Sequence, residues 1–167
     1  MMTLVFLATA PIPSTPELGK AEGICRPNEA GAAYLVDVRG LKDRAGRLKL
    51  ELYPATDADF LADDNLLVGA GKPFRRIEAP VPDSGPVQLC IRAPGPGVYA
   101  LSLLHDRDAN RRFALSVDGV GFANNPRLSL SKPRAAAASA AVGSSPTRIT
   151  IIVNYRRGLF SFGTVGK

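Results

Sequence analysis

The chain has 167 residues, of which 46% are hydrophobic and 22% are charged, a balance that is typical of one globular domain and excludes a disordered chain. Sixteen glycines and fourteen prolines favour a fold with many turns over a helical one. The formal net charge of +6 suits anionic partners. Because the basic residues are scattered in short pairs and tryptophan is absent, nucleic-acid binding is disfavoured and a solvated basic surface is preferred.

The first residues resemble the end of a secretory signal. Thr3 to Ala10 is apolar, and Ala8-Thr9-Ala10 has the small-x-small pattern that precedes signal cleavage. We therefore expect residues 1–33 to form a signal remnant and leader segment, residues 34–167 to form a single domain, and the protein to reach the periplasm or cell surface. A frayed N-terminal segment is the alternative. No later segment approaches the roughly 18 apolar residues of a membrane span.

Two segments on either side of residue 43 have the alternation of half-buried strands. Residues 34–41 place Val36 and Val38 on one face, and residues 46–54 place three leucines on one face. The turn-forming residues between them, from Lys42 to Gly46, predict that the two strands form a hairpin.

The alternation stops after residue 55. Thr56, with Asp59 three positions later, resembles a helix N-cap and predicts one or two helical turns in a crossover. The segment also contains four aspartates, which we interpret as a solvated helix start: Asp57, Asp59, Asp63 and Asp64.

Strand patterns return in three later segments, residues 73–81, 85–93 and 97–105, which are separated by turns rich in proline and glycine, and again in residues 147–155. The alanine-rich stretch 135–141 is helical by propensity. Because it is short and precedes a strong strand, we predict an irregular strand there that feeds a hairpin. Short strands at roughly ten-residue spacing with little helix predict an all-β fold, an antiparallel sandwich of about seven strands.

The two cysteines also bear on the compartment. Cys90 alternates with the apolar residues of its strand and therefore lies off the main core face. A disulfide with Cys25 would hold the leader across the outside of the sheet and close a loop of roughly 65 residues. A pair with no cysteine left over fits an oxidising compartment, with two buried free thiols as the alternative.

A polar loop follows the strand pattern 97–105. Asp106, Asp108 and Asn110 stand at alternate positions and could direct three oxygens towards calcium, which takes six to eight. Arg111 occupies the sixth position, where a calcium loop has glycine, and Val117 the twelfth, where it has glutamate. We therefore prefer a structural role in which the aspartates cap loop amides or pair with neighbouring arginines, and we expect no cofactor. A calcium-stabilised domain is the alternative.

His105 is the only histidine of the chain and precedes this loop. It shares a strand face with Leu101 and Leu103, which places it at the rim of the core. A structural histidine with satisfied hydrogen bonds is preferred. The alternative is a hydrolase or isomerase that uses His105 with Asp106 or Asp108 for acid–base chemistry.

The segment "GVYALSLLHDRDANRRF", followed by "DGVGFANNP", resembles the bacterial exported domains of domain-of-unknown-function family 2141. In that family a strand with the pattern Y-A-x-x-x-x-H-D leads into an Asp/Asn-rich loop and a G-x-G-F-x-N-N segment. The similarity spans about residues 34–155. The matching positions are Tyr99, Ala100, His105, Asp106, Gly119, Gly121, Phe122, Asn124 and Asn125.

The resemblance implies an immunoglobulin-like or prealbumin-like sandwich with a signal peptide, and it implies no established activity. It also suggests that Asn124 or Asn125 supplies a hydrogen bond to His105. Our leading hypothesis is a non-catalytic module that binds an anionic envelope polymer or a protein partner through loops 105–112 and 119–126. The candidate binding residues are His105, Asp106, Asp108, Asn110, Phe122, Asn124 and Asn125.

Overall fold

A computed structural model of the chain describes residues 10–159 and 161–166. The apolar start of the expected signal remnant, residues 1–9, lies outside the described residues. The described elements, in chain order, are α1 (Lys20–Gly23), β1 (Ala33–Arg39), β2 (Arg47–Pro54), α2 (Asp64–Gly69), β3 (Arg75–Pro80), β4 (Val87–Arg92), β5 (Gly97–Asp106), β6 (Gly119–Phe122), the 3₁₀ helix η1 (Ala135–Ala138), β7 (Ser139–Val142), β8 (Thr147–Ile152), β9 (Asn154–Arg156) and β10 (Phe162–Gly163).

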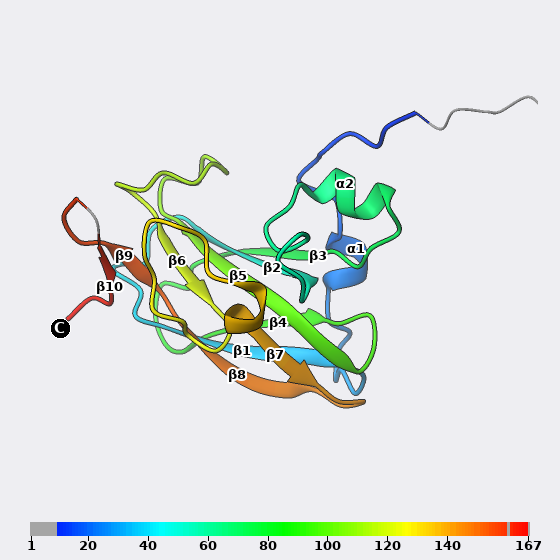
Figure 1. Cartoon of the computed structure of the whole chain (residues 1–167). Helices are drawn as coiled ribbons and strands as arrows, with labels where there is room; N and C mark the ends of the chain where they lie inside the picture. Colours follow the sequence, from blue (N-terminus) through cyan, green and yellow to red (C-terminus); the bar gives the residue numbers. More distant parts are fainter. Residues whose placement is uncertain (1–9, 160, 167) are drawn as a thin grey trace, which may run out of the picture.

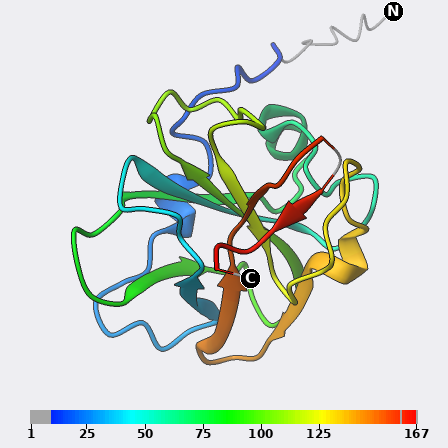
Figure 2. The same cartoon turned by 90° about the vertical axis from the view of Figure 1, so that its left-hand side faces the viewer.

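Two β-sheets form the sandwich (Figure 1). The smaller sheet has the order β4-β1-β8, in which β1 runs antiparallel to β4 and parallel to β8. The larger sheet has the order β10-β9-β6-β5-β2-β3, and β7 pairs with the beginning of β5 on the edge that β6 occupies further along. Figure 2 looks onto the end of the sandwich where β10 lies. The predicted all-β sandwich is confirmed, with β1 and β8 as a parallel pair.

The larger sheet carries apolar side chains on both faces. Its inner face contributes Leu48, Leu50 and Leu52 of β2 to the main core, which also contains Val36 and Val38 of β1. Its outer face contributes to a second buried cluster, which is covered by residues 55–74 and η1. This outer cluster consists of Tyr53, Phe60, Leu67, Phe74, Ala100, Phe122, Ala135 and Ala138.

The hairpin predicted between β1 and β2 is wrong, because the two strands lie in different sheets. Residues 40–46 cross from one sheet to the other. Alternation determines which side chains face the core, but both strands face the same core, so it could not assign them to a sheet. At the crossing, Gly46 has a φ of 71°, and a Cβ there would lie 2.0 Å from the carbonyl oxygen of Asp106. Only glycine fits such an approach.

The predicted helical segment is present as α2, but it begins at Asp64 and not near Thr56. The Thr56 hydroxyl donates to the Asp59 carboxylate over 2.9 Å and accepts from the backbone N–H of Asp59 over 3.3 Å. The N–H of Phe60 donates to the carbonyl of Thr56, so the predicted cap is present on a single turn. The four aspartates of this segment are not all solvated as predicted, since Asp59 and Asp64 are buried. Lys72 Nζ lies 2.5 Å from Asp59, and Arg76 Nη2 lies 3.0 Å from Asp64. These ion pairs compensate the carboxylates for the loss of solvent.

The alanine-rich stretch divides into η1 and β7, so the predicted irregular strand is confirmed from Ser139 onwards. The hairpin with the following strand is wrong, because β7 pairs with β5 and β8 pairs with β1. Ala135 and Ala138 are buried in the outer cluster. Their small side chains let η1 pack closely on the larger sheet, which explains a helical turn where a strand pattern was expected.

The disulfide between Cys25 and Cys90 is confirmed. It joins the leader to β4 across 65 positions of sequence, and Ile24 forms a β-bridge with Ile91. The N–H of Arg76 donates to the carbonyl of Gly19, so the leader also covers the edge of β3. In the described part of the chain, none of the helices is long and apolar enough to cross a membrane.

Candidate functional site

The polar loop between β5 and β6 is organised by two buried aspartates. Asp106 accepts hydrogen bonds from the backbone N–H groups of Asn110 and Arg111, over 3.1 and 2.9 Å. Asp118 accepts from the backbone N–H groups of Arg107 and Ala114, over 3.0 and 2.8 Å. Each of the two side chains is 1% exposed. All four carboxylate oxygens therefore satisfy loop amides, as the capping hypothesis predicts.

The tip of the loop repeats this arrangement with exposed residues. Asp108 accepts a bond from the side-chain amide of Asn110 over 2.7 Å, and Asn110 accepts from the backbone N–H of Arg112 over 2.7 Å. Ala109 and Arg111 have φ values of 56° and 64°. These lie in the left-handed region of backbone conformation, which residues other than glycine and asparagine rarely adopt. The aspartate and asparagine bonds hold this tight turn in place.

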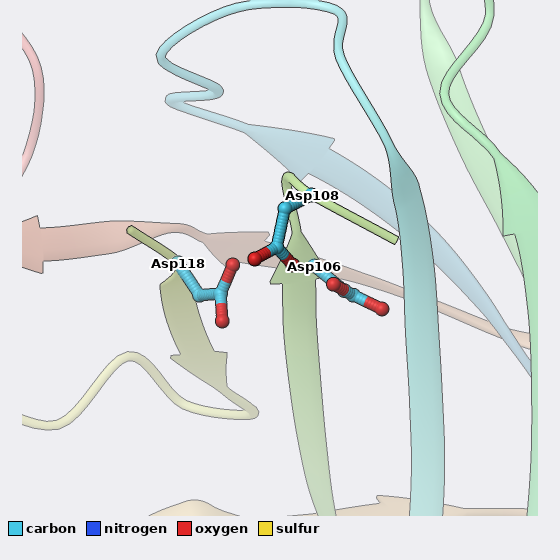
Figure 3. A group of neighbouring side chains, drawn as sticks. All are labelled: Asp106, Asp108 and Asp118. Atoms are coloured by element: carbon cyan, nitrogen blue, oxygen red, sulfur yellow. The ribbon is translucent and has the colours of Figure 1, made fainter. Parts of the chain in front are cut away.

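Three carboxylates gather where the loop leaves and rejoins the sheet (Figure 3). One oxygen from each of Asp106, Asp108 and Asp118 lies within 4.8 Å of the others. Figure 3 shows the carboxylates of Asp108 and Asp118 facing each other. Asp118 was absent from the predicted set because it stands outside the alternating pattern. The pairing of β5 with β6 brings it back beside Asp106.

Two arginines of the loop form ion pairs with carboxylates outside this aspartate cluster. The Arg107 guanidinium binds Asp43, and Arg111 Nη2 lies 3.7 Å from Glu78. Of the two predicted alternatives for Asp106 and Asp108, the described contacts show the capping of loop amides and no ion pair with these arginines. The cluster offers three of the six to eight oxygens that calcium takes, but the oxygens of its two buried members already accept amide hydrogen bonds.

His105 lies inside the core and not at its rim, with a fully buried side chain. Its Nε2 is 2.8 Å from the carbonyl oxygen of Ala45, and its Nδ1 is 2.6 Å from the hydroxyl of Tyr155. A carbonyl can only accept, so we assign the ring proton to Nε2, and Nδ1 accepts from the phenol. Burial lowers the pKa of His105. The Asp106 oxygens bond to loop amides and not to the ring.

Gly119 leaves room for the contact between His105 and Tyr155. In the sheet register, Gly119 of β6 is the partner of His105 on one side and of Tyr155 on the other. A Cβ on Gly119 would lie 2.4 Å from Cε1 of Tyr155. The two rings therefore meet over a position that has no side chain. Gly121 is equally constrained, with 2.6 Å from its ideal Cβ to Cγ2 of Ile151.

The two asparagines after β6 do not contact His105, contrary to expectation. Both have left-handed backbone conformations, with φ of 59° at Asn124 and 48° at Asn125, which asparagine tolerates better than most residues. The Asn125 side chain donates to the carbonyl of Thr150 and accepts from the N–H of Ile152, each over 2.8 Å. The Asn125 side chain thus hydrogen-bonds to backbone groups of β8 that lie on the edge of the strand facing away from β1.

An apolar groove of about 310 Å³ lies on the outer face of the larger sheet, beside the outer cluster. The sheet contributes Leu104, Val120 and Phe122, and the two flanking loops contribute exposed apolar residues. The exposed fractions of Phe113, Leu115 and Leu130 are 49, 42 and 57%. Sites for small ligands are concave, mostly apolar and upwards of about 300 Å³. The groove has these properties.

Three charged residues also line the groove: Lys49, Glu51 and Lys132. Glu51 is compensated, since Lys49 Nζ lies 3.2 Å and Arg76 Nη2 2.7 Å from its Oε1. Lys132 donates instead to two backbone carbonyls, those of Asp57 and Phe60, over 3.1 and 2.9 Å.

The predicted site residues do not form one surface. Asp106, Asp108 and Asn110 hold the loop, His105 is in the core, and Asn125 binds the edge of β8. Phe122 alone of the predicted set lines the groove. The apolar groove residues of the two flanking loops were missed because alternation does not indicate that they meet on one surface. In "RLSLSKP", Leu128 and Leu130 alternate with serine as in a strand, yet the segment is a loop.

Comparison with known proteins gives one finding. Residues 36–150 match the model of a family described as an uncharacterized protein conserved in bacteria, DUF2141. The matched range includes the aspartate cluster, His105, both asparagines and most of the groove. No curated protein and no solved structure matches the chain.

Proposed function

The chain belongs to DUF2141, a family of uncharacterized bacterial proteins, and we propose that it is a non-catalytic module that binds a small apolar ligand in the groove beside Phe122. The observation that carries this proposal is the exposure of Phe113, Leu115 and Leu130 around one concavity. Scattered apolar residues on a surface need no explanation, but a contiguous group around a concave site favours ligand binding.

The chemistry of the groove favours binding over catalysis. Its lining includes Ser129 and Ser131 but no histidine that could activate them. The ring of His105 is fully buried and both of its nitrogens are engaged within the protein. A general base must reach the proton that it abstracts. The hydrolase or isomerase alternative therefore has little support.

The proposal includes a location in the periplasm or at the cell surface and no metal cofactor. The Cys25–Cys90 disulfide is the support for the location, because such bonds persist in oxidising compartments. The support for a metal-free loop is that Asp106 and Asp118 use both of their oxygens to accept loop amides. An anionic envelope polymer or a protein partner, the earlier hypothesis, would need a surface that the predicted residues do not form together.

The test is binding of N-phenyl-1-naphthylamine, an uncharged apolar dye whose fluorescence rises in an apolar site. We expect saturable enhancement with the oxidised protein. Phe113→Ser and Leu130→Ser should each weaken the dye's affinity about fivefold, the effect of losing about 1 kcal/mol of apolar contact. Val98 is 55% exposed and does not line the groove, so Val98→Ser is the matched control. Absence of saturable enhancement, or an equal loss in Val98→Ser, would contradict the proposal.

A further inference from the structure

The charge of the chain is distributed unevenly along the sequence. Residues 119–167 contain no aspartate or glutamate. The same stretch contains seven of the basic residues: Arg127, Lys132, Arg134, Arg148, Arg156, Arg157 and Lys167. Much of the groove is built from this acid-free stretch, including Phe122 and residues 128–133. The stretch therefore has a formal net charge of +7, and of its described basic residues Lys132 is the one that lines the groove.

Lys132 is the cation of the groove that lacks a carboxylate. Among the described residues, no acidic group lies within ion-pair distance of its Nζ, whereas Lys49 is paired with Glu51. The two carbonyls that accept from Lys132 belong to the turn at residues 57–60, and they fix the ammonium in place without neutralising it. An oriented, uncompensated cation beside an apolar surface is complementary to an anion that carries an apolar chain.

We propose that the ligand of the groove is a single-chain anionic amphiphile of the fatty-acid class, whose alkyl chain lies on Phe122, Phe113 and Leu130 and whose carboxylate pairs with Lys132. A volume of about 310 Å³ is at the lower end of the range for small-ligand sites, which favours one chain over a two-chain lipid. This inference rests on the proposed function and adds the class of ligand. It commits to the free amphiphile and not to a membrane surface.

The test compares decanoate with decan-1-ol, which share the chain and differ in charge. Dissociation constants are measured by calorimetry below the micelle concentration, for the unaltered protein and for Lys132→Met. We expect the preference for decanoate over the alcohol to fall about two- to fivefold in the variant, the range that one solvent-accessible ion pair gives. Lys42→Met is the matched control, because Lys42 is exposed and does not line the groove.

Two further measurements test the role of charge and the membrane alternative. Lys132→Arg retains the cation and should retain the preference for decanoate, even if the bonds to the turn are weakened. Sedimentation with phosphatidylglycerol vesicles tests the membrane alternative, and binding to vesicles without binding of decanoate would overturn the inference.

The outcomes distinguish the two proposals. If neither decanoate nor the alcohol binds, the proposed function itself fails. If both bind and Lys132→Met leaves their ratio unchanged, the groove remains a ligand site and the anionic class is wrong. If Lys42→Met reduces the preference for decanoate as much as Lys132→Met does, the preference results from the net charge of the protein. That result would also overturn the inference.

Discussion

The hydroxyl of Tyr155 lies 2.6 Å from Nδ1 of His105, and this hydrogen bond joins β9 to β5 across the intervening strand β6. The same hydroxyl accepts a bond from the backbone N–H of Lys42 over 2.9 Å. Together with the bond from Nε2 to Ala45, the pair connects the larger sheet to the segment that crosses between the sheets. With the ring proton assigned to Nε2, the histidine makes both bonds in its neutral form.

Replacement of Gly119 by alanine should destabilise the domain, because the new methyl group would lie 2.4 Å from the Tyr155 ring. Overpacking of this kind costs about 1–3 kcal/mol, and loss of the bond to His105 adds to it. The free energy of unfolding is measured by urea titration. Val120→Ala, at a half-buried position of the same strand that faces the groove, is the control and should cost less. Equal stability of Gly119→Ala and the unaltered protein would contradict this account.

The stability of the protein should fall as the pH falls below about 6.5. Burial lowers the pKa of His105 from 6.5, so the unfolded chain takes up the proton first and the folded state loses stability until it also titrates. Unfolding by urea is compared at pH 7.5 and 5.5, above the range in which carboxylates titrate. We expect His105→Gln to lose less stability than the unaltered protein between these two values. The same loss in both proteins would show that another group is responsible.

Asn125 should protect the edge of β8 from solvent and from pairing with other chains. In Asn125→Gly, glycine can adopt the same left-handed backbone conformation, but both side-chain hydrogen bonds to β8 are removed. We expect a loss of about 1–2 kcal/mol and faster hydrogen exchange at the amide of Ile152. Asn124→Gly, which retains the Asn125 side chain, is the control. Unchanged exchange at Ile152 in Asn125→Gly would contradict the assigned role.

Calcium should have little effect on unfolding, because the buried aspartates of the loop already bind amides. Thermal unfolding in millimolar calcium and in chelator should give the same Tm. A site filled at 100 times its Kd would add about 2.7 kcal/mol, on the order of 5–10 °C for a domain of this size. A shift of that size, lost in Asp118→Asn, would make the aspartate cluster a metal site.

Much of the fold could be predicted from local patterns. Alternation located β1 to β5 and β8, although not β6 or β10. It also placed Cys90 on the outer side of β4, where it meets Cys25. The partners of each strand could not be predicted in the same way. β1 and β2, or β7 and β8, are neighbours in sequence but lie in different sheets, because both sheets turn apolar faces to one core. Pairing depends on contacts between distant segments, which periodicity does not encode.

The candidate site could be predicted only in part for a related reason. The capping by Asp106 and Asp108 is local and was anticipated, whereas Asp118 joins them through the pairing of β5 with β6. The groove lies on the outer face of the larger sheet, where Leu104, Val120 and Phe122 are apolar and two loops flank them. Phe113 and Leu130 lie in loops that are far apart in sequence, so their convergence becomes visible only in three dimensions.

The most direct test of the central claim is a ¹H–¹⁵N correlation NMR titration of the oxidised protein with decanoate. We predict saturable shifts that are largest at the amides of Phe113, Leu115 and Leu130, with smaller ones near Lys132. The loops at residues 26–31 and 92–96, which line a separate cavity of about 390 Å³, should stay unchanged. Shifts confined to those loops, or no saturable shift at all, would contradict the claim that the groove is a ligand site.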